Sequence, residues 1–341
     1  FAENLAPLLR DGDRIWVHDY HLIPLASELR ALGVGARTGF FLHIPLPPTE
    51  LLINLPCHAD LLATLGACDL VGVQNRDDAR ALCDYFTRVL GAQRSRDDVE
   101  LAGRKTRIAP FPISIDTAAV ARQSQAAVGK PAVRKLRDSL SGRKLAIGVD
   151  RLDYSKGLTR RFEAFGRFLS DHREWRSRVS FLQIAPPSRE EVPEYRELRS
   201  RLERSAGATN GRYAEPDWVP IRYVNRSFAQ ATLAGFYRIA QLGLVTPLRD
   251  GMNLVAKEFV AAQPPDDPGV LVLSRFAGAA GELPQAILVN PYDPEGLVEG
   301  IEQGLTMPLA ERRDRWAAMF EHISGHDIAA WRKDFLAALG A

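Results

Sequence analysis

Length, composition and charge describe an ordinary globular protein with two domains. The chain has 341 residues, of which 46% are hydrophobic and 25% are charged, and this length exceeds the usual size of a single hydrophobic core. The net charge of +2, with basic residues scattered among acidic ones, excludes a basic nucleic-acid surface, and no apolar run approaches the roughly 20 residues of a membrane span.

Strands and helices alternate along the chain, which predicts an α/β fold whose parallel sheets are covered by helices on both faces. In the first half we expect strands at 15–18, 38–43, 69–73 and 107–110, with helices beginning near His21, Glu50 and Asp77. In the second half we expect strands at 144–149, 179–184, 221–224, 242–246, 270–273 and 287–289, with helices beginning near Lys156, Arg189, Phe228, Asn253 and Ala280. Beyond Pro294 the sequence is helical to its end.

A polar stretch at 123–143 separates the two halves and contains the turn signal Gly129-Lys130-Pro131. We therefore expect a first domain at 1–125 and a second at 126–326, followed by a terminal helical segment at 327–341. Three cysteines, Cys57, Cys68 and Cys83, are odd in number and lack metal-type spacing. They predict buried free thiols in a reducing cytoplasm, and the lack of a signal peptide adds to the expectation of a cytoplasmic protein.

The most informative stretch runs from Leu244 to Glu258. The apolar strand at 242–246 breaks at Pro247, passes Asp250 and Gly251, and leads into a helix at Asn253. In an open α/β sheet, ligands bind where strands end and helices begin, because the helix N-terminus offers free N–H groups to an anion. Asp250 is suited to accept hydrogen bonds from sugar hydroxyls. The alternative is an ordinary strand-loop-helix with a solvated Arg-Asp pair.

A second loop of the same kind follows the strand at 144–149 and precedes an amphipathic helix at 158–169. It carries Arg151 and Lys156, a guanidinium fork and a point charge, which together suit a diphosphate. Read alone it also fits a solvated basic loop. One cationic loop and one carboxylate-bearing loop in the same domain favour a sugar nucleotide.

Seven motifs resemble those of the trehalose-6-phosphate synthases, the retaining enzymes of glycosyltransferase family 20, in both order and spacing. They are Trp16-Val17-His18-Asp19-Tyr20-His21-Leu22, Phe40 to Pro45, Phe111-Pro112-Ile113, Arg151 to Gly157, Ala185-Pro186-Pro187-Ser188-Arg189, Arg249 to Glu258, and Phe276-Ala277-Gly278-Ala279-Ala280. The resemblance implies the GT-B fold, in which two Rossmann-like domains face a cleft and the last helix crosses back to the first domain. It also implies that about the first hundred residues of the family are absent, which leaves the N-terminal domain incomplete.

The resemblance implies transfer of glucose from UDP-glucose to glucose-6-phosphate, giving α,α-trehalose 6-phosphate and UDP. Other readings stay open. A sister enzyme such as glucosylglycerol-phosphate synthase would use another acceptor, and a non-catalytic regulatory homologue would bind the sugar nucleotide without turnover. A UDP-sugar epimerase of similar fold is a third reading, but it would not explain the motifs around Asp19 and Arg189.

By the same resemblance, Asp19 and His43 are catalytic residues. Asp19 contacts the acceptor and influences its nucleophilic hydroxyl, and His43 lies beside the donor glucose and its anomeric centre. Arg189 binds the acceptor phosphate. From residue type alone, Asp19 also fits an N-cap for the following helix, and His43 fits a packed strand-end residue. A cation such as Arg189 at a helix N-terminus is electrostatically unfavourable, which favours a ligand role.

On the donor side, the resemblance assigns catalytic charge stabilisation to Arg151 and Lys156, ribose binding to Glu258, and a backbone contact with uracil to Phe228. From residue type alone, Phe228 fits core packing. The remaining expected donor ligands form one continuous run: Asp250, Gly251, Met252, Asn253, Leu254, Val255, Ala256 and Lys257.

We expect no metal and no cofactor. No Asp-x-Asp pair stands at a strand end, and the acidic pairs Asp77-Asp78 and Asp97-Asp98 are interpreted as solvent-facing. Family resemblance implies a dimer or tetramer, substrates UDP-glucose and glucose-6-phosphate, and trehalose-6-phosphate phosphatase as the enzyme acting next.

Overall fold

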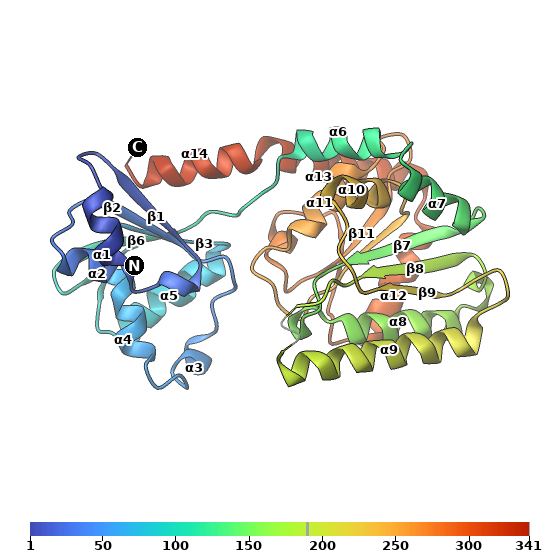
Figure 1. Cartoon of the computed structure of the whole chain (residues 1–341), viewed down its shortest axis with the longest axis horizontal. Helices are drawn as coiled ribbons and strands as arrows, with labels where there is room; N and C mark the ends of the chain where they lie inside the picture. Colours follow the sequence, from blue (N-terminus) through green and yellow to red (C-terminus); the bar gives the residue numbers. More distant parts are fainter. Residues whose placement is uncertain (189–190, 341) are drawn as a thin grey trace. The chain divides into compact units, whose positions relative to one another are not determined.

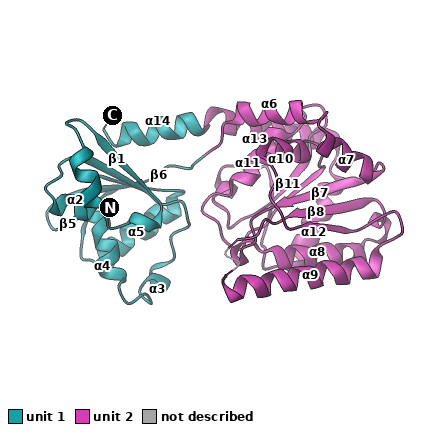
Figure 2. Ribbon diagram, viewed as in Figure 1, with its two compact units in different colours: residues 1–113, 328–341 teal, residues 114–327 magenta. Residues whose placement is uncertain are grey.

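The computed structural model describes residues 1–188 and 191–340, and the chain divides into two compact units (Figures 1 and 2). Unit 1 comprises Phe1–Ile113 and Ile328–Ala341, and unit 2 comprises Ser114–Asp327. The division at residue 113 precedes the expected boundary at 125, because the polar stretch after it is not a linker. It holds two helices of unit 2, α6 (Thr117–Ala127) and α7 (Pro131–Leu140), joined at the expected turn.

Unit 1 is built on a six-stranded sheet in the order β1-β2-β3-β6-β5-β4. Its parallel part confirms the expected strands and consists of β1 (Arg14–His18), β2 (Arg37–Phe41), β3 (Leu70–Val73) and β6 (Arg104–Pro110). One edge of this sheet was not predicted: there β4 (Gln93–Ser95) and β5 (Asp98–Leu101) form antiparallel pairs. These edge strands are short and polar, so their sequence carries no apolar run.

The helices of unit 1 cover both faces of this sheet. They are α1 (Ala2–Leu5), α2 (Leu25–Ala31), α3 (Thr49–Leu52), α4 (His58–Ala63), α5 (Arg76–Arg88) and α14 (Ile328–Ala338), with 3-10 turns η1 (Ala6–Leu8), η2 (Tyr20–Leu22) and η3 (Thr64–Ala67). Successive side chains of a strand point to opposite faces of the sheet, so the core of unit 1 forms two hydrophobic clusters. Ile15 and Val17 belong to the larger cluster, and Trp16 packs against the smaller one.

The smaller cluster holds α14 against the sheet. Phe335 is fully buried, and its ring stacks on Trp16 with centroids 4.2 Å apart. Two strand glycines make room for it, since a Cβ on Gly39 or Gly72 would lie 2.8 or 2.7 Å from the Phe335 ring. The C-terminal helix is therefore a structural part of unit 1 (Figure 2).

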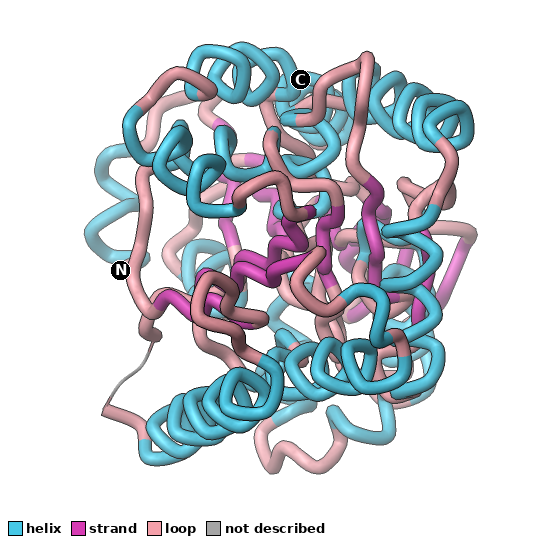
Figure 3. The backbone as a smooth tube through the Cα atoms, turned by 90° about the vertical axis from the view of Figure 1, so that its right-hand side faces the viewer, coloured by secondary structure: helices cyan, strands magenta, loops and turns pink. Residues whose placement is uncertain are grey.

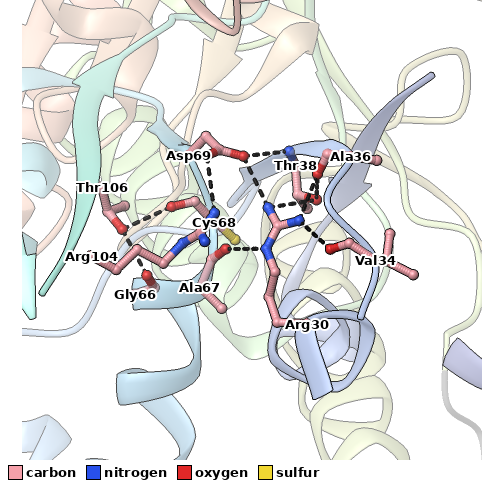
Figure 4. A network of polar contacts seen from close by, with 10 residues as sticks. All are labelled: Arg30, Val34, Ala36, Thr38, Gly66, Ala67, Cys68, Asp69, Arg104 and Thr106. Carbon is pink, nitrogen blue, oxygen red and sulfur yellow. Dashed lines mark hydrogen bonds and ion pairs between the residues drawn. The ribbon is translucent and has the colours of Figure 1, made fainter. Parts of the chain in front are cut away.

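A polar network centred on Asp69 lies at the amino-terminal end of the unit 1 strands (Figure 4). Its carboxylate accepts from Arg30 at 3.1 Å, from Arg104 at 3.0 Å and from the backbone N–H of Thr38 at 2.8 Å. Arg30 also donates to the carbonyl groups of Val34 and Ala36, so α2 is tied to the start of β2. The neighbouring Cys68 thiol is buried, and burial raises its pKa to about 12, which makes it unreactive.

Unit 2 contains a six-stranded, all-parallel sheet in the order β12-β11-β10-β7-β8-β9. The strands are β7 (Lys144–Val149), β8 (Val179–Ile184), β9 (Ile221–Val224), β10 (Leu242–Val245), β11 (Val270–Ser274) and β12 (Ile287–Val289). Their near-continuous apolar sequences are typical of strands buried on both faces, and the sequence placed every one of them within a residue.

Helices lie on both faces of this sheet (Figures 1 and 3). One layer holds α6, α7, α10 (Gln230–Arg238), α11 (Leu254–Ala262) and α13 (Leu309–Gly325), and the other holds α8 (Leu158–Asp171), α9 (Pro193–Tyr213) and α12 (Pro294–Thr306). The 3-10 turns are η4 (Tyr154–Lys156), η5 (Arg173–Trp175) and η6 (Gly278–Gly281). The helix expected near Ala280 is only η6, since two glycines bound it.

Two further expectations are wrong in detail. Cys57 is exposed, whereas Cys68 and Cys83 are buried free thiols as expected. Asp78 is buried rather than solvent-facing, because Asn75, the N-cap of α5, donates to it at 2.9 Å. No helix among the described residues is long and apolar enough to cross a membrane.

Candidate nucleotide-sugar site

The strand order of unit 2 fixes where a ligand binds. Strands β7 and β10 are hydrogen-bonded neighbours, but the chain leaves β7 toward β8 on one side and returns to β10 on the other. This reversal is a topological switch point, where the loops after the two strands diverge and leave a crevice. The loops after these strands, 150–157 and 246–253, are the two that the sequence singled out.

The first loop is held by its own side chains. Asp153 caps η4, accepting from the N–H of Ser155 at 2.9 Å and from its hydroxyl at 2.8 Å. Gly157 adopts φ 66°, and a Cβ there would lie 2.6 Å from the carbonyl oxygen of Thr246. Glycine is therefore required where the two loops approach each other.

The cations of this loop differ in their surroundings. The Lys156 ammonium donates to Asp250 Oδ2 at 2.5 Å, which joins the cationic loop to the carboxylate-bearing loop. Arg151 extends into solvent with 59% of its side chain exposed, and its Nε lies 3.4 Å from Asp153. The expected alternative, a solvated pair of Asp250 with its sequence neighbour Arg249, is therefore wrong for Asp250, whose side chain is only 17% exposed.

A third loop, which follows β11, supports Asp250 from the backbone. The N–H of Asp250 donates to the carbonyl of Phe276 at 3.1 Å, and the N–H of Gly278 donates to the carbonyl of Asp250 at 3.2 Å. The N–H of Ala279 donates to Met252 at 2.9 Å. A Cβ on Gly278 would collide with the Gly251 carbonyl, so this close approach explains the small residues at 277–281.

Helix α11 begins at this crevice. Asn253 precedes it at φ 70°, and its side-chain amide donates to Asp250 at 3.0 Å instead of capping the helix. The first-turn N–H groups therefore remain available to an anion, and the helix dipole favours one. Asn253 Oδ1 is buried without a hydrogen-bond partner in the described structure, which is an acceptor that a ligand can satisfy.

Glu258 lies one helical turn further along α11, beside Gln230 and Tyr237 of α10. Burial raises the pKa of its carboxyl, although Gln230 and Tyr237 oppose the shift. The fully buried Tyr237 phenol has a pKa well above its usual value, because it is desolvated and lies beside this carboxylate. A half-buried carboxylate with a raised pKa is typical of a ligand-binding position.

Other expected donor ligands have side chains directed into the core. Lys257 is fully buried and pairs with Glu282 at 2.6 Å, with His322 Nε2 3.3 Å from the same carboxylate. Met252 and Ala256 are also buried. These three residues can offer a ligand only their backbone. Phe228 lies two residues before α10, where its ring packs on Phe236 and under Arg226.

A buried arginine that the sequence reading missed supports both loops. Arg161 of α8 donates to Asp150 at 2.7 Å, to Gln183 at 2.9 Å and to Thr246 at 2.9 Å. It also donates to the backbone carbonyl of Lys156 at 3.3 Å. Its sequence signal was hidden, since an arginine inside an amphipathic helix is typical of a solvated face.

In unit 1, the expected residues lie where β1 and β2 end. Asp19 follows β1 with φ 66°, and its N–H donates to the carbonyl of Phe41 at 2.8 Å. It does not cap η2 through its side chain, so the capping alternative is wrong. Its Oδ1 is buried and has no partner among the described residues. A strained backbone that presents an unsatisfied carboxylate is typical of a functional site.

His43 lies just beyond β2, and its ring is 3.0 Å from that of His18, measured between His43 Nε2 and His18 Nδ1. Gln74, which is buried after β3, donates to the His43 carbonyl at 3.4 Å and accepts from the N–H of Ile113 at 3.1 Å. Burial lowers the pKa of both imidazoles, so each is neutral at pH 7. Neither His18 nor Gln74 was assigned a role from the sequence.

Two further expectations concern Arg189 and a metal ion. Arg189, the expected phosphate ligand, lies outside the described residues. Within residues 1–188 and 191–340, no cluster of three or more His, Cys, Asp or Glu side chains is arranged to hold a metal ion.

Comparisons with known proteins identify the family. Residues 1–341 match the family model described as glycosyltransferase family 20. The chain is 50% identical over 342 residues to the trehalose-6-phosphate synthase of Sinorhizobium fredii (strain NBRC 101917 / NGR234), covering 100% of this chain and 74% of that protein.

Solved structures of trehalose-phosphate synthases are also similar to this chain. An α,α-trehalose-phosphate synthase (UDP-forming) from Burkholderia xenovorans in complex with glucose-6-phosphate has a TM-score of 0.98 and 47% identity, covering 100% of this chain and 75% of that one. An E. coli structure bound with UDP-2-fluoro glucose has a TM-score of 0.96 and 44% identity, covering 99% and 75%. Fold and site define a nucleotide-sugar-dependent transferase of the GT-B class. The chain belongs to glycosyltransferase family 20.

Proposed function

We propose that this chain transfers glucose from UDP-glucose to glucose-6-phosphate with retention of configuration, giving α,α-trehalose 6-phosphate and UDP. The observation that carries the proposal is the Lys156–Asp250 pair at the switch point of unit 2. It sets an ammonium suited to a phosphate beside a carboxylate suited to sugar hydroxyls, close to the start of α11. Relatives that share the fold and almost half the sequence are named for this reaction.

In the proposed donor complex, unit 2 holds UDP-glucose. The ribose hydroxyls donate to Glu258, and the diphosphate contacts Arg151, Lys156 and the free N–H groups of α11. Lys156 and Asp250 form an ion pair at this position. In the proposed complex the ammonium faces the diphosphate, and the carboxylate accepts from the glucose hydroxyls.

Catalysis in this proposal is mainly electrostatic. As the bond between the anomeric carbon and the diphosphate breaks, negative charge grows on the leaving oxygen, and Arg151 and Lys156 stabilise it without moving far. The acceptor hydroxyl attacks from the same face, and its proton passes to the leaving diphosphate, which accounts for retention. No metal is required, because the two cations and the helix N-terminus supply the positive charge.

Unit 1 supplies the acceptor-side residues in the same proposal. The unsatisfied Asp19 carboxylate accepts from a hydroxyl of glucose-6-phosphate, and His43 contacts the transferred glucose. Arg189 binds the acceptor phosphate. The product carries a phosphate and suits a trehalose-6-phosphate phosphatase as the next enzyme. Self-association into a dimer or tetramer belongs to the same proposal and is tested by light scattering.

UDP release with different acceptors tests the function. We expect release with UDP-glucose and glucose-6-phosphate, little with glycerol 3-phosphate, and an α,α-linked disaccharide phosphate by proton NMR. Lys156→Ala serves as the control for contaminating activity. Faster turnover with glycerol 3-phosphate would indicate the sister specificity, and UDP binding without release under any acceptor would indicate a non-catalytic homologue.

A further inference from the structure

The pair formed by His18 and His43 links the ends of two neighbouring strands in unit 1. His18 is the last residue of β1 and lies opposite Phe41, the last residue of β2. His43 follows two residues later. Their side chains meet with His18 Nδ1 and His43 Nε2 3.0 Å apart, which is hydrogen-bonding distance.

Aromatic side chains fix the orientation of both rings. The His18 ring lies 4.6 Å from that of Trp16, and the His43 ring meets the edge of Phe41 at 4.7 Å. Trp331 of α14 approaches both imidazoles, at 6.2 and 6.4 Å between centroids. The Trp331 indole is itself anchored, since its N–H donates to the carbonyl of Phe111 at 3.0 Å. Three elements of unit 1 therefore hold the pair in one arrangement.

This geometry restricts where the ring protons lie. Both imidazoles have lowered pKa values, chiefly because they are desolvated, so each carries one proton at neutral pH. A hydrogen bond between two neutral rings needs one donor and one acceptor. In one arrangement both rings are protonated on Nε2, and His43 donates to His18. In the other, both are protonated on Nδ1, and His18 donates to His43.

The first arrangement is favoured, because neutral histidine intrinsically prefers the Nε2–H tautomer and here both rings adopt it. His43 then uses its Nε2–H within the pair, and its Nδ1 remains a bare acceptor. In a site that binds sugars, such a nitrogen can accept a hydrogen bond from a hydroxyl. The tautomer of a functional histidine is set in this way by the partner of its other nitrogen.

We propose that His18 is a positioning residue that holds His43 in the Nε2–H tautomer, with Nδ1 presented as an acceptor for a hydroxyl of the transferred glucose. This inference rests on the proposed glycosyltransfer. It assigns a role to a histidine of the first motif that the donor and acceptor contacts do not use.

Two substitutions at one position separate positioning from structure. His18 lies outside the two hydrophobic clusters of unit 1, so its replacement leaves the core intact. His18→Leu removes the acceptor and keeps apolar contact with Trp16. His18→Asn places an amide oxygen near the position of Nδ1, where it can accept from His43. At metal sites, residues that orient a ligating histidine are typically worth about 10- to 100-fold in activity, and we expect an effect of similar size here.

We expect His18→Leu to lower kcat for UDP release by about 10-fold or more, with the KM for glucose-6-phosphate little changed. His18→Asn should restore most of the lost kcat, and thermal unfolding should shift little in either variant. A His18→Leu enzyme with unchanged kcat, or an Asn variant as slow as the Leu variant, would overturn the inference.

Nitrogen NMR on histidine-labelled protein reads the tautomer without activity. We expect His43 to be protonated on Nε2 in the wild type at pH 7.5 and to become a tautomer mixture in His18→Leu. His58, whose Nδ1 lies 2.6 Å from the Tyr85 hydroxyl, serves as the unchanged internal reference. A wild-type His43 protonated on Nδ1 refutes the inference. A wild-type chain with the expected tautomer that releases no UDP with any acceptor refutes the proposed function instead.

Discussion

Single residues in both units adopt conformations that their local structure does not explain. Asp19 and Asn253 have φ values of 66° and 70°, and each leaves a buried side-chain oxygen without a partner in the described structure. A non-glycine residue in this region costs of order 1–3 kcal/mol, and a buried unsatisfied acceptor costs about 1–3 kcal/mol more. In each unit, a ligand that donates to the unsatisfied oxygen would recover part of that cost.

The two cations of the loop after β7 should each contribute to the transition state. We expect Arg151→Ala and Lys156→Ala to lower kcat/KM by about 100-fold, as loss of one charged donor to a developing anion typically does. Steady-state UDP release measures the effect, with Arg160→Ala, whose guanidinium packs on the Tyr292 ring, as a matched control. Near-full turnover in a folded Arg151→Ala enzyme would remove the diphosphate assignment.

Glu258 should favour binding at the expense of stability. Its folded-state pKa is raised, so the folded chain holds this proton more tightly than the unfolded chain does. The carboxyl therefore contributes stability below its unfolded pKa, and this contribution is lost as the pH rises through the raised value. Glu258→Gln should accordingly raise the melting temperature at pH 7.5 by more than at pH 4.5, as measured by scanning calorimetry.

The same substitution should weaken UDP binding, since the amide replaces a charged acceptor of two ribose hydroxyls. We expect a loss of about 10-fold or more in affinity by titration calorimetry at pH 7.5, and a smaller loss at a pH where the wild-type carboxyl is protonated. A variant that binds UDP as tightly as the wild type would exclude Glu258 as the ribose ligand.

The sequence could predict site residues when their side-chain type and their position in a loop after a strand together indicate a ligand-binding role. Asp19, His43, Lys156 and Asp250 all lie at the carboxyl ends of strands, as expected. It could not predict the partners, because Lys156 meets Asp250 only after three loops converge. Arg161 was missed for the same reason, since burial of a charge depends on contacts from strands far apart in the chain.

At the scale of elements, the buried charge pair of Arg161 and Asp150 joins α8 to the ends of β7, β8 and β10. We expect Arg161→Leu to destabilise the protein by about 3–5 kcal/mol, because it leaves the Asp150 carboxylate buried and unpaired. The double substitution Arg161→Leu with Asp150→Leu should cost less than the sum of the two single ones. Urea unfolding measures all three, and additive costs would mean that the charges are not coupled.

Helix α14 should be equally sensitive at one position. Phe335→Ala removes the ring that fills the space over Gly39 and Gly72, and it should destabilise unit 1 by about 3–5 kcal/mol. Urea unfolding followed by tryptophan fluorescence reports the change, because Trp331 belongs to this helix and Trp16 packs against it. Lys333→Ala, on the exposed side of the same helix, is the control. Equal midpoints for the two variants would contradict the packing argument.

Elements were predictable where hydrophobicity defines them. The six strands of unit 2 are apolar and buried on both faces, so their sequences reveal them. The hairpin of β4 and β5 in unit 1 escaped detection because Gln93, Arg94 and Ser95 are polar and exposed, and only pairing with β6 makes them a sheet. The boundary between units was misplaced because a polar, turn-containing stretch was taken for a linker.

At the scale of the whole molecule, the charge supplied to the diphosphate predicts metal-independent turnover. We expect UDP release to survive dialysis against EDTA within about twofold, since in the proposed complex side-chain cations and a helix N-terminus supply the charge that a divalent ion would otherwise supply. Loss of activity on chelation that added Mg²⁺ or Mn²⁺ restores would contradict this prediction.

The discontinuity of unit 1 also governs how the chain is made. Residues 1–113 leave the ribosome before unit 2, but the helix that covers one face of their sheet arrives only after the intervening unit of about 200 residues, a delay on the order of 10 to 40 s during translation. Throughout that interval Phe41 and the two strand glycines lack their cover. Unit 2, which is continuous in sequence, can complete its fold first, and the nascent N-terminal sheet is then the segment that most needs chaperones.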